Sequence, residues 1–284
     1  MKVVSLCDLL TYSENNKVGI GMFNIVNLEF AQAIFNASQK TGLPVMMGMP
    51  ERFFQFYDAY GMAAACRKLV ESSKTPIAIH LDHGKTFNGV MTALKAGFSS
   101  VMFDGSALPY EENVRQTAEI VKIAHAWGVS VEGELGYVGR VGVDELDTDG
   151  FTQPKQAEDF VERTGVDALA IAVGNQHGQY KGVPNLDFER IKEIRECVDC
   201  GLVLHGGTGI SEGDFVKAIR CGISKINIHT ALDVAARNFN KENFAKYDAY
   251  LDYTKGLVTA VEEVIVEHMQ LFATIKRETQ ESEI

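Results

Sequence analysis

Eight short apolar runs, rich in β-branched residues, recur along this chain and constrain its fold more than any other feature. They are residues 18–23, 44–49, 76–81, 99–103, 129–133, 168–173, 202–205 and 224–228. Their starts lie roughly 20 to 40 residues apart, which is the spacing of alternating strand and helix units. The runs therefore predict eight β-strands with a helix after each.

The segments between the runs carry the complementary pattern. Residues 28–40, 111–126, 155–164 and 188–197 each show a one-sided apolar stripe, as expected of helices packed on a sheet. A glycine precedes six of the strands, where a helix is expected to end in the left-handed conformation: Gly42, Gly97, Gly128, Gly165, Gly201 and Gly222. Eight such repeats predict an α/β fold, a closed (β/α)8 TIM barrel, rather than an open doubly wound sheet.

The length of 284 residues suits one barrel of ~250 residues with some decoration. We therefore expect a single domain over residues 1–284. After the eighth run, residues 243–276 are helical in pattern. This predicts a helical C-terminal extension over about 236–284, an arm that packs on another subunit of a homodimer or homotetramer.

Charge and composition exclude several classes of protein. The net charge of −11 repels nucleic acid and anionic lipid, so neither is an expected partner. No apolar run reaches the ~18 residues of a membrane span, and the first residues lack the pattern of a signal peptide, which predicts a cytoplasmic protein. Five scattered cysteines argue against a disulfide framework, and Cys197 and Cys200 have no second pair for a zinc ribbon.

Chemistry in such a barrel gathers at the C-terminal ends of the strands. Five of the seven histidines stand at the C-terminal end of a predicted strand: His80, His83, His177, His205 and His229. Any one of these is readily explained as a core residue with satisfied hydrogen bonds. His83, His177 and His205 each stand beside a glycine on a different strand, and three converging imidazoles are a catalytic zinc arrangement.

Three carboxylates stand at the same ends. Asp82 precedes His83 where the chain is already turning, so it can face the site as a proton shuttle or orient an imidazole. Asp104 and Glu134 can ligate a second or displaced metal, or bond to loop backbone.

A glycine-rich loop supplies the other half of the predicted site. Residues 206–209, Gly-Gly-Thr-Gly, follow the seventh strand, and residues 227–230 follow the eighth. These are the two places where barrels commonly bind phosphate with backbone N–H groups. Zinc beside a phosphate pocket suggests Lewis-acid polarisation of a phosphorylated ketone.

Seven segments together resemble the class II, zinc-dependent ketose-bisphosphate aldolases, the fructose- and tagatose-bisphosphate aldolase family. They are residues 23–29, 80–84, 100–106, 131–136, 177–182, 204–209 and 225–228. The resemblance implies that His83, His177 and His205 hold Zn²⁺, that Glu134 and Asp104 are alternate ligands, and that Asp82 is the general acid/base. It implies substrate contacts at Asn24, Gly178, Lys181, Gly206, Gly207, Thr208, Asn227, Ile228, His229 and Thr230.

The implied reaction is reversible cleavage of a ketose 1-phosphate or 1,6-bisphosphate to dihydroxyacetone phosphate and an aldehyde. The implied cofactors are zinc and a monovalent cation, Na⁺ or K⁺. In this family a second acid comes from a loop after the fifth strand, where Asp144 and Glu145 are the candidates.

Three residues depart from the family pattern toward the aldehyde half of the substrate: Met49, His229 and Ala231. They predict an altered aldehyde, such as that of a tagatose-type epimer, a deoxy-keto acid phosphate or a sulfonated sugar. Two other classes compete. A zinc hydrolase would want an HxH pair at the first strand, where Phe23 and Asn24 stand, and a non-catalytic phosphate-binding regulatory barrel would lack Asp82 or a zinc-binding histidine.

Overall fold

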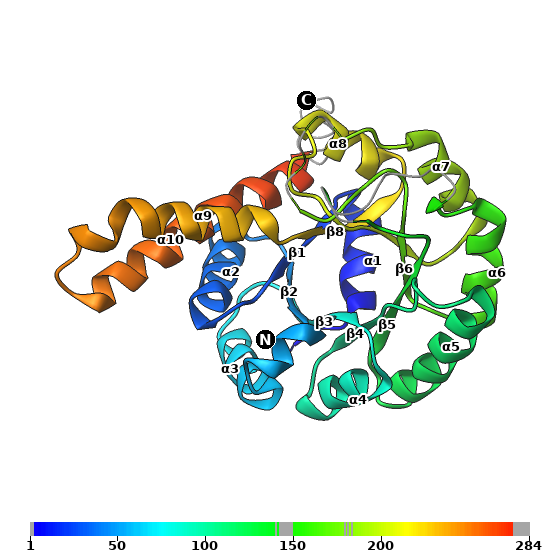
Figure 1. Ribbon diagram of the computed structural model, residues 1–284, viewed down its shortest axis with the longest axis horizontal. Coiled ribbons are helices and arrows are strands. Elements are labelled where there is room, and N and C mark those ends of the chain that lie inside the picture. Colours follow the sequence, from blue (N-terminus) through cyan, green and yellow to red (C-terminus); the bar gives the residue numbers. More distant parts are fainter. Residues whose placement is uncertain are drawn as a thin grey trace.

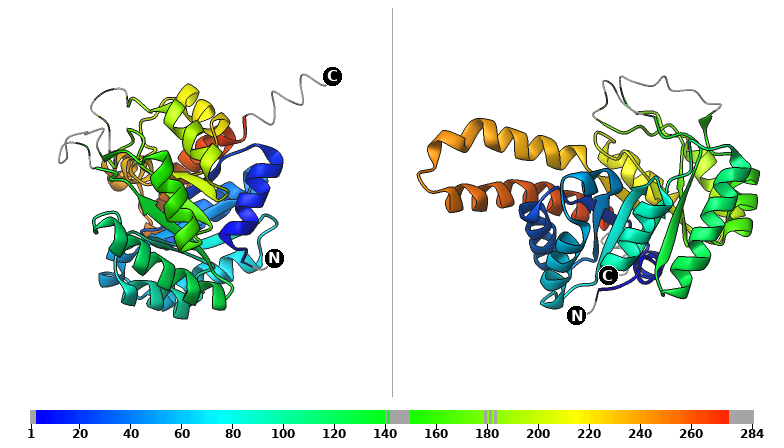
Figure 2. Two further views of the ribbon diagram at one scale, coloured as in Figure 1. Left: turned by 90° about the vertical axis from the view of Figure 1, so that its right-hand side faces the viewer. Right: turned by 60° about the horizontal axis from the view of Figure 1, so that its bottom comes forward.

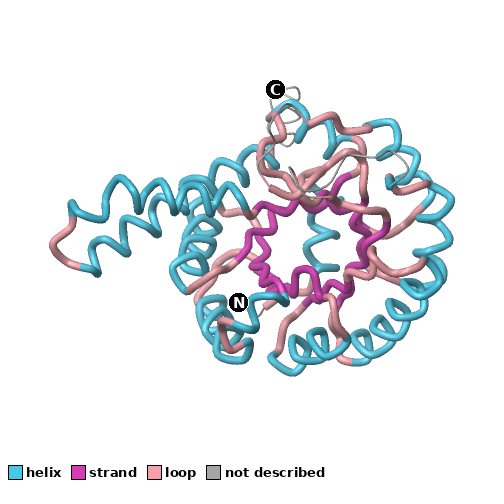
Figure 3. The backbone as a smooth tube through the Cα atoms, in the orientation of Figure 1, coloured by secondary structure: helices cyan, strands magenta, loops and turns pink. Residues whose placement is uncertain are grey.

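The computed structural model describes residues 3–139, 141, 150–178, 180, 182 and 184–274. Its eight strands close a parallel barrel in chain order (Figures 1 and 3). The strands are β1 (Ile20–Asn24), β2 (Val45–Pro50), β3 (Ile77–Gly84), β4 (Ser100–Phe103), β5 (Ser130–Leu135), β6 (Ala168–Ile171), β7 (Gly201–Leu204) and β8 (Ile223–Ile228). The TIM barrel predicted from the eight runs is confirmed.

Helices surround the barrel, as Figure 3 shows. They are α1 (Leu6–Asn16), α2 (Leu28–Thr41), η1 (Glu51–Gln55, a 3-10 helix), α3 (Ala59–Glu71), α4 (Phe87–Ala96), α5 (Tyr110–Ala126), α6 (Pro154–Thr164), α7 (Phe188–Cys197), α8 (Glu212–Arg220), α9 (Thr230–Asn243), η3 (Phe244–Lys246, also 3-10) and α10 (Tyr250–Phe272). The four helices predicted from apolar stripes are α2, α5, α6 and α7. No described helix is both long and apolar enough to span a membrane.

The glycine prediction holds at five of its six positions. Gly42, Gly97, Gly128, Gly165 and Gly222 have positive φ angles. Gly201 is the exception, because it is the first residue of β7 and ends no helix. Its small size serves packing instead: a Cβ there would lie 2.5 Å from the Leu10 side chain of α1.

The barrel interior is layered, because alternate residues of each strand point inward. At the N-terminal end of the strands, α1 buries Leu6 and Leu9 against an apolar layer that includes Met22, Met46 and Met102. Polar inward positions interleave with these apolar ones, since Met102 follows Ser100 on β4 and pairs with Glu132 of β5. Four of the polar side chains are fully buried: His80, Ser100, Glu132 and Lys225.

The C-terminal segment differs from the prediction of one helix over 243–276. The chain turns between η3 and α10, so α9 and α10 lie side by side as a helical hairpin that projects from the barrel (Figures 1 and 2). The residues around the turn include the exposed aromatic side chains Phe244, Tyr247 and Tyr250, and the apolar stripe of residues 257–269 begins only after them. The last turns of α10 return to the body, where Phe272 is fully buried and its carbonyl accepts a hydrogen bond from Gly19 N (3.0 Å).

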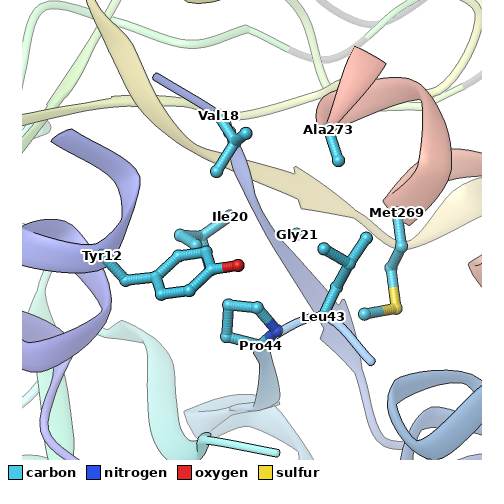
Figure 4. A pocket seen from close by; sticks show the side chains of 9 residues that line it. Tyr12, Val18, Ile20, Gly21, Leu43, Pro44, Met269 and Ala273 are labelled. Atoms are coloured by element: carbon cyan, nitrogen blue, oxygen red, sulfur yellow. The ribbon is translucent and has the colours of Figure 1, made fainter. Parts of the chain in front are cut away.

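A small cavity lies where α10 meets the start of β1 (Figure 4). Tyr12, Pro44, Met269 and Ala273 line it with their neighbours, and its volume is about 10 Å³. That is space for about one water molecule, so the cavity is no substrate site.

Candidate active site

A pocket of about 1160 Å³ opens at the C-terminal ends of the strands. Its lining includes fourteen of the predicted site residues: Asn24, Asp82, His83, Asp104, Glu134, His177, Gly178, His205, Gly206, Gly207, Thr208, Asn227, His229 and Thr230. Residues far apart in the chain therefore come together because barrel closure brings their strand ends to one rim.

Several other sequence-based candidates fall elsewhere. Ile228 does not line the pocket, because its side chain is fully buried in the core outside the barrel. Met49 is buried in that same core, and Ala231 uses its backbone N–H to donate to Thr208 Oγ1 (3.0 Å). Lys181, Asp144 and Glu145 lie outside the described residues.

The end of β3 explains how Asp82 and its neighbour His83 both reach the pocket. Successive strand residues normally face opposite ways. Here the pairing of β3 with β4 shifts register between Leu81 and Gly84, and His83 takes a φ of 44°. This left-handed backbone costs about 1–3 kcal/mol for a residue with a side chain, and such strain concentrates at functional sites.

Three imidazoles form the centre of the pocket. The ligand nitrogens of His83, His177 and His205 all lie within 4.8 Å of one another. His83 Nε2 and His205 Nδ1 are 3.1 Å apart. In His83 and His205 the other ring nitrogen contacts a carboxylate. His83 Nδ1 lies 2.7 Å from Asp104 Oδ2, and His205 Nε2 lies 2.9 Å from Glu132 Oε1.

A second group of possible metal ligands shares His83 and adds Asp104 and Glu134. Asp104 also accepts hydrogen bonds from Ser106 and forms an ion pair with Lys85 (2.5 Å). Glu134 Oε2 is buried and has no hydrogen-bond partner among the described residues. A buried oxygen of this kind is available to a cation.

Asp82 is held by two amides. Asn24 Nδ2 donates to Oδ2 (2.9 Å), and Asn227 Nδ2 donates to Oδ1 (3.2 Å). Burial alone would raise the pKa of this carboxyl, but the nearby charges of His83 and His205 outweigh burial and hold the pKa below its usual range. Asp82 is therefore an ionised carboxylate held in a fixed orientation.

The charges around the three imidazoles differ in their effects. Burial opposes the charged form of His83, yet Asp82 and Asp104 raise its pKa to about 9. Burial, reinforced by the charge of His83, lowers the pKa of His177. Burial and the charge of Asp104 raise the pKa of Glu134 to about 8.

The loops after β7 and β8 form one pole of the pocket. Gly206 has a φ of 66°, and a Cβ there would lie 2.1 Å from the carbonyl oxygen of Gln176. No other residue type fits that position without movement. Helix α9 begins at Thr230, directly after β8, so its N-terminus lies at this pole, where backbone N–H groups favour an anion.

Sequence reasoning assigned no role to several residues that the structure places in or under the pocket. Arg52 and Gln55 of η1 and Lys85 line it. Glu132 and Lys225 lie beneath it. Alternation along β5 and β8 puts Glu132 on the same face as Glu134 and Lys225 on the same face as Asn227, a signal that was present in the sequence.

Comparisons with known proteins agree with this geometry. The family model described as fructose-bisphosphate aldolase class-II matches residues 4–277. A probable fructose-bisphosphate aldolase of Bacillus subtilis is 40% identical over 282 residues, which cover 96% of this chain and 99% of the relative. A fructose-bisphosphate aldolase of Geobacillus stearothermophilus is 43% identical over 251 residues, with 87% of each chain covered.

A solved structure gives the same answer. The YdjI aldolase of Escherichia coli K12 superposes with a TM-score of 0.87 at 36% identity, covering 95% of this chain and 97% of that one. These matches replace the hydrolase and the non-catalytic barrel as readings of the site. The chain belongs to the class-II fructose-bisphosphate aldolase family and is an aldolase.

Proposed function

We propose that this aldolase uses zinc to cleave, reversibly, a ketose 1-phosphate or 1,6-bisphosphate into dihydroxyacetone phosphate and an aldehyde. One observation carries the proposal: three imidazoles from three strands converge beside Asp82 in a pocket with a phosphate-type pole. Phosphorylated sugar is the partner, and a monovalent cation, Na⁺ or K⁺, near the phosphate is part of the proposal.

The residues present fit a zinc ion. His83 Nε2 and His205 Nδ1 face each other, and a carboxylate contacts the opposite nitrogen of each ring. His83 is protonated near neutral pH when no metal is bound, because its pKa is raised to about 9. An incoming cation would displace that proton, and the two facing nitrogens, 3.1 Å apart, would then both be free to bind it. His83, His177 and His205 would hold the ion, with Asp104 and Glu134 as alternate ligands. When bound, zinc supplies a Lewis acid that polarises the substrate ketone.

The proton chemistry belongs to Asp82. Its carboxylate, fixed by Asn24 and Asn227, takes the proton of the C4 hydroxyl. The C3–C4 bond breaks, its electron pair moves toward the C2 carbonyl, and the aldehyde leaves with a new C=O bond. The remaining three-carbon unit then gains a proton at C3 to give dihydroxyacetone phosphate.

The phosphate of that three-carbon unit binds at the pole formed by the loops after β7 and β8. Gly178, Gly206 and Gly207 allow close approach to the backbone, and Thr208 and Thr230 add hydroxyls. Asn227 joins this pole to Asp82. The protein's negative net charge makes such a local trap necessary.

The aldehyde half binds at a second pole, near η1. Arg52 and Gln55 line this pole. His229 belongs to the loop after β8, but its ring lies 6.2 Å from the Phe53 ring of η1 and so contributes to this pole as well. Both oxygens of Glu51 already accept hydrogen bonds at the start of α4, from Thr86 and from Lys85 N. The pole therefore offers mainly donors, which favours an aldehyde with an anionic or differently placed hydroxyl group.

Metal dependence is the first test. Chelation should abolish cleavage, zinc should restore it, and His177→Ala should bind far less zinc than the wild type. Full activity after metal removal, or inactivation by borohydride in the presence of substrate, would replace zinc with a lysine Schiff base.

Substrate identity needs a condensation screen. Dihydroxyacetone phosphate is incubated with aldehydes bearing phosphate, carboxylate, sulfonate or no charge, and the products are identified. A kcat/KM for fructose 1,6-bisphosphate of ~10⁴ M⁻¹s⁻¹ or better, above that of every alternative, would show that the altered residues do not change the substrate.

We also propose a cytoplasmic homodimer or homotetramer. The exposed aromatic side chains Phe244, Tyr247 and Tyr250 at the tip of the helical hairpin support self-association. Light scattering coupled to size-exclusion chromatography measures the mass directly, and a monomer would contradict this assembly.

A further inference from the structure

A buried ionic layer lies directly beneath the pocket, and the cleavage scheme above assigns it no role. Lys225, on β8, is fully buried and forms an ion pair with Glu132 of β5 (Nζ to Oε2, 2.8 Å). His80 and Ser100, also fully buried, complete the layer. His80 Nδ1 lies 2.7 Å from Ser100 Oγ.

Stability alone does not explain this pair. Burying two charges is costly, and apolar residues of similar volume often serve as well or better. The same interior accepts apolar filling, because Met22, Met46 and Met102 occupy neighbouring inward positions. The ion pair therefore calls for a role in the site above it.

The pair reaches the site by two routes. On one side, Glu132 Oε1 contacts His205 Nε2 (2.9 Å), which leaves His205 Nδ1 directed at His83. On the other side, Lys225 Nζ donates to Asn227 Oδ1 (2.7 Å). Because its oxygen is occupied, the Asn227 amide presents its NH₂ group to Asp82 Oδ1 (3.2 Å).

We propose that Lys225 is a positioning residue that orients the metal-binding ring of His205 through Glu132 and the proton-accepting Asp82 through Asn227. This inference rests on the proposed zinc aldolase function. Without the ammonium group, Asn227 loses the hydrogen-bond donor that fixes the orientation of its side-chain amide. Glu132 then becomes a buried carboxylate with no lysine beside it.

The test uses the full-length protein and four variants. They are Lys225→Met, Glu132→Gln, the double variant with both changes, and Lys192→Met as control. Lys192 forms a surface ion pair with Glu189 of about the same length (2.8 Å) on α7, away from the pocket. Three quantities are measured: the zinc dissociation constant by chelator competition, the melting temperature, and deuterium exchange into dihydroxyacetone phosphate by NMR.

Lys225→Met should bind zinc about 10- to 100-fold more weakly, the range seen when a partner of a metal ligand is removed. Its exchange rate at saturating zinc should fall with little change in the KM for dihydroxyacetone phosphate. The double variant removes both buried charges, so its melting temperature should recover relative to the single variants, while zinc affinity and exchange rate stay low. Lys192→Met should match the wild type in all three.

Three results would overturn the proposal. The first is that Lys225→Met or the double variant equals the wild type in zinc affinity and exchange rate. The second is that zinc affinity and exchange rate recover in the double variant together with the melting temperature. The third is that the double variant fails to fold, which would make the ion pair structural. Failure of the proposed function itself looks different, because wild-type protein would then bind zinc no better than His177→Ala.

Discussion

The two poles of the pocket are built from different materials. At the β7–β8 pole, glycine backbone and the start of α9 shape the surface, and Gly206 tolerates no Cβ. At the η1 pole, the surface consists of side chains, among them Arg52, Gln55 and His229. A surface made of backbone atoms keeps its shape through most substitutions, whereas a surface made of side chains is altered by a single substitution. The contrast teaches that the three-carbon half of the substrate is fixed in this barrel and the aldehyde half is adjustable.

Asp82 lies between the poles and serves both, so its loss should have the largest effect. Asp82→Ala should keep zinc yet lose cleavage by about 10²- to 10⁴-fold, the usual contribution of a general acid/base. Kinetics and metal analysis on the same preparation provide the measurement. A variant that instead loses zinc would make Asp82 a structural support for the imidazoles.

The β7–β8 pole can be broken by one methyl group. Gly206→Ala places a Cβ against the Gln176 carbonyl at a φ of 66°, so we expect a loss of about 1–3 kcal/mol of stability and a higher KM for every substrate. Thermal unfolding and steady-state kinetics measure both. Gly213→Ala in α8, where a Cβ meets only Ser211 Oγ at 4.0 Å, is the matched control and should not weaken substrate binding. A Gly206→Ala enzyme with normal KM values would remove the backbone pole from substrate binding.

The η1 pole should respond selectively. His229→Ala and Arg52→Ala should change the ratio of kcat/KM between aldehydes by roughly 10- to 100-fold, since a pocket that pairs a polar group discriminates strongly against analogues lacking it. Deuterium exchange into dihydroxyacetone phosphate should be unaffected, because that partial reaction never uses the aldehyde half. Equal losses in both assays would contradict the division into two poles.

The smallest expected effect concerns pH. Burial, and then the charge of Arg52, lowers the pKa of His229 from its ordinary value. A lowered pKa means that the imidazole is neutral from about pH 6.5 upward and acts as one donor and one acceptor rather than as a cation. The ratio of kcat/KM between anionic and neutral aldehydes should therefore stay constant from pH 6.5 to about 8.5. A ratio that falls steeply over this range would indicate a charged imidazole.

Local sequence signals predicted the barrel because they are repeated in every unit. Two-residue alternation, one-sided stripes and terminal glycines such as Gly97 and Gly165 each depend on neighbours in the chain. The turn before α10 was missed because the apolar stripe of residues 257–269 gives no boundary on its N-terminal side. The arm was likewise expected to begin too far along the chain, since α9 starts at Thr230.

The site residues also divide into those that local sequence predicts and those that only the closed barrel brings together. The histidines and acidic residues at strand ends could be predicted, because the C-terminal ends of all eight strands meet at one rim of the barrel. The ion pair of Lys225 with Glu132 was not, since those residues are far apart in the chain and meet only when β8 and β5 face each other across the closed interior. Ile228 was placed at the pocket by resemblance, although alternation with Asn227 points it the other way.

The apolar cluster that α1 forms with Met22, Met46 and Met102 has a consequence for the evolution of such enzymes. Leu6, Leu9 and Met46 belong to this apolar cluster and none of them lines the pocket, so a change of a pocket-lining side chain leaves their packing against one another in place. New substrate preferences can then accumulate at η1 and β8 while the melting temperature stays nearly constant. In enzymes with this architecture the aldehyde specificity can therefore change repeatedly without a cumulative loss of stability.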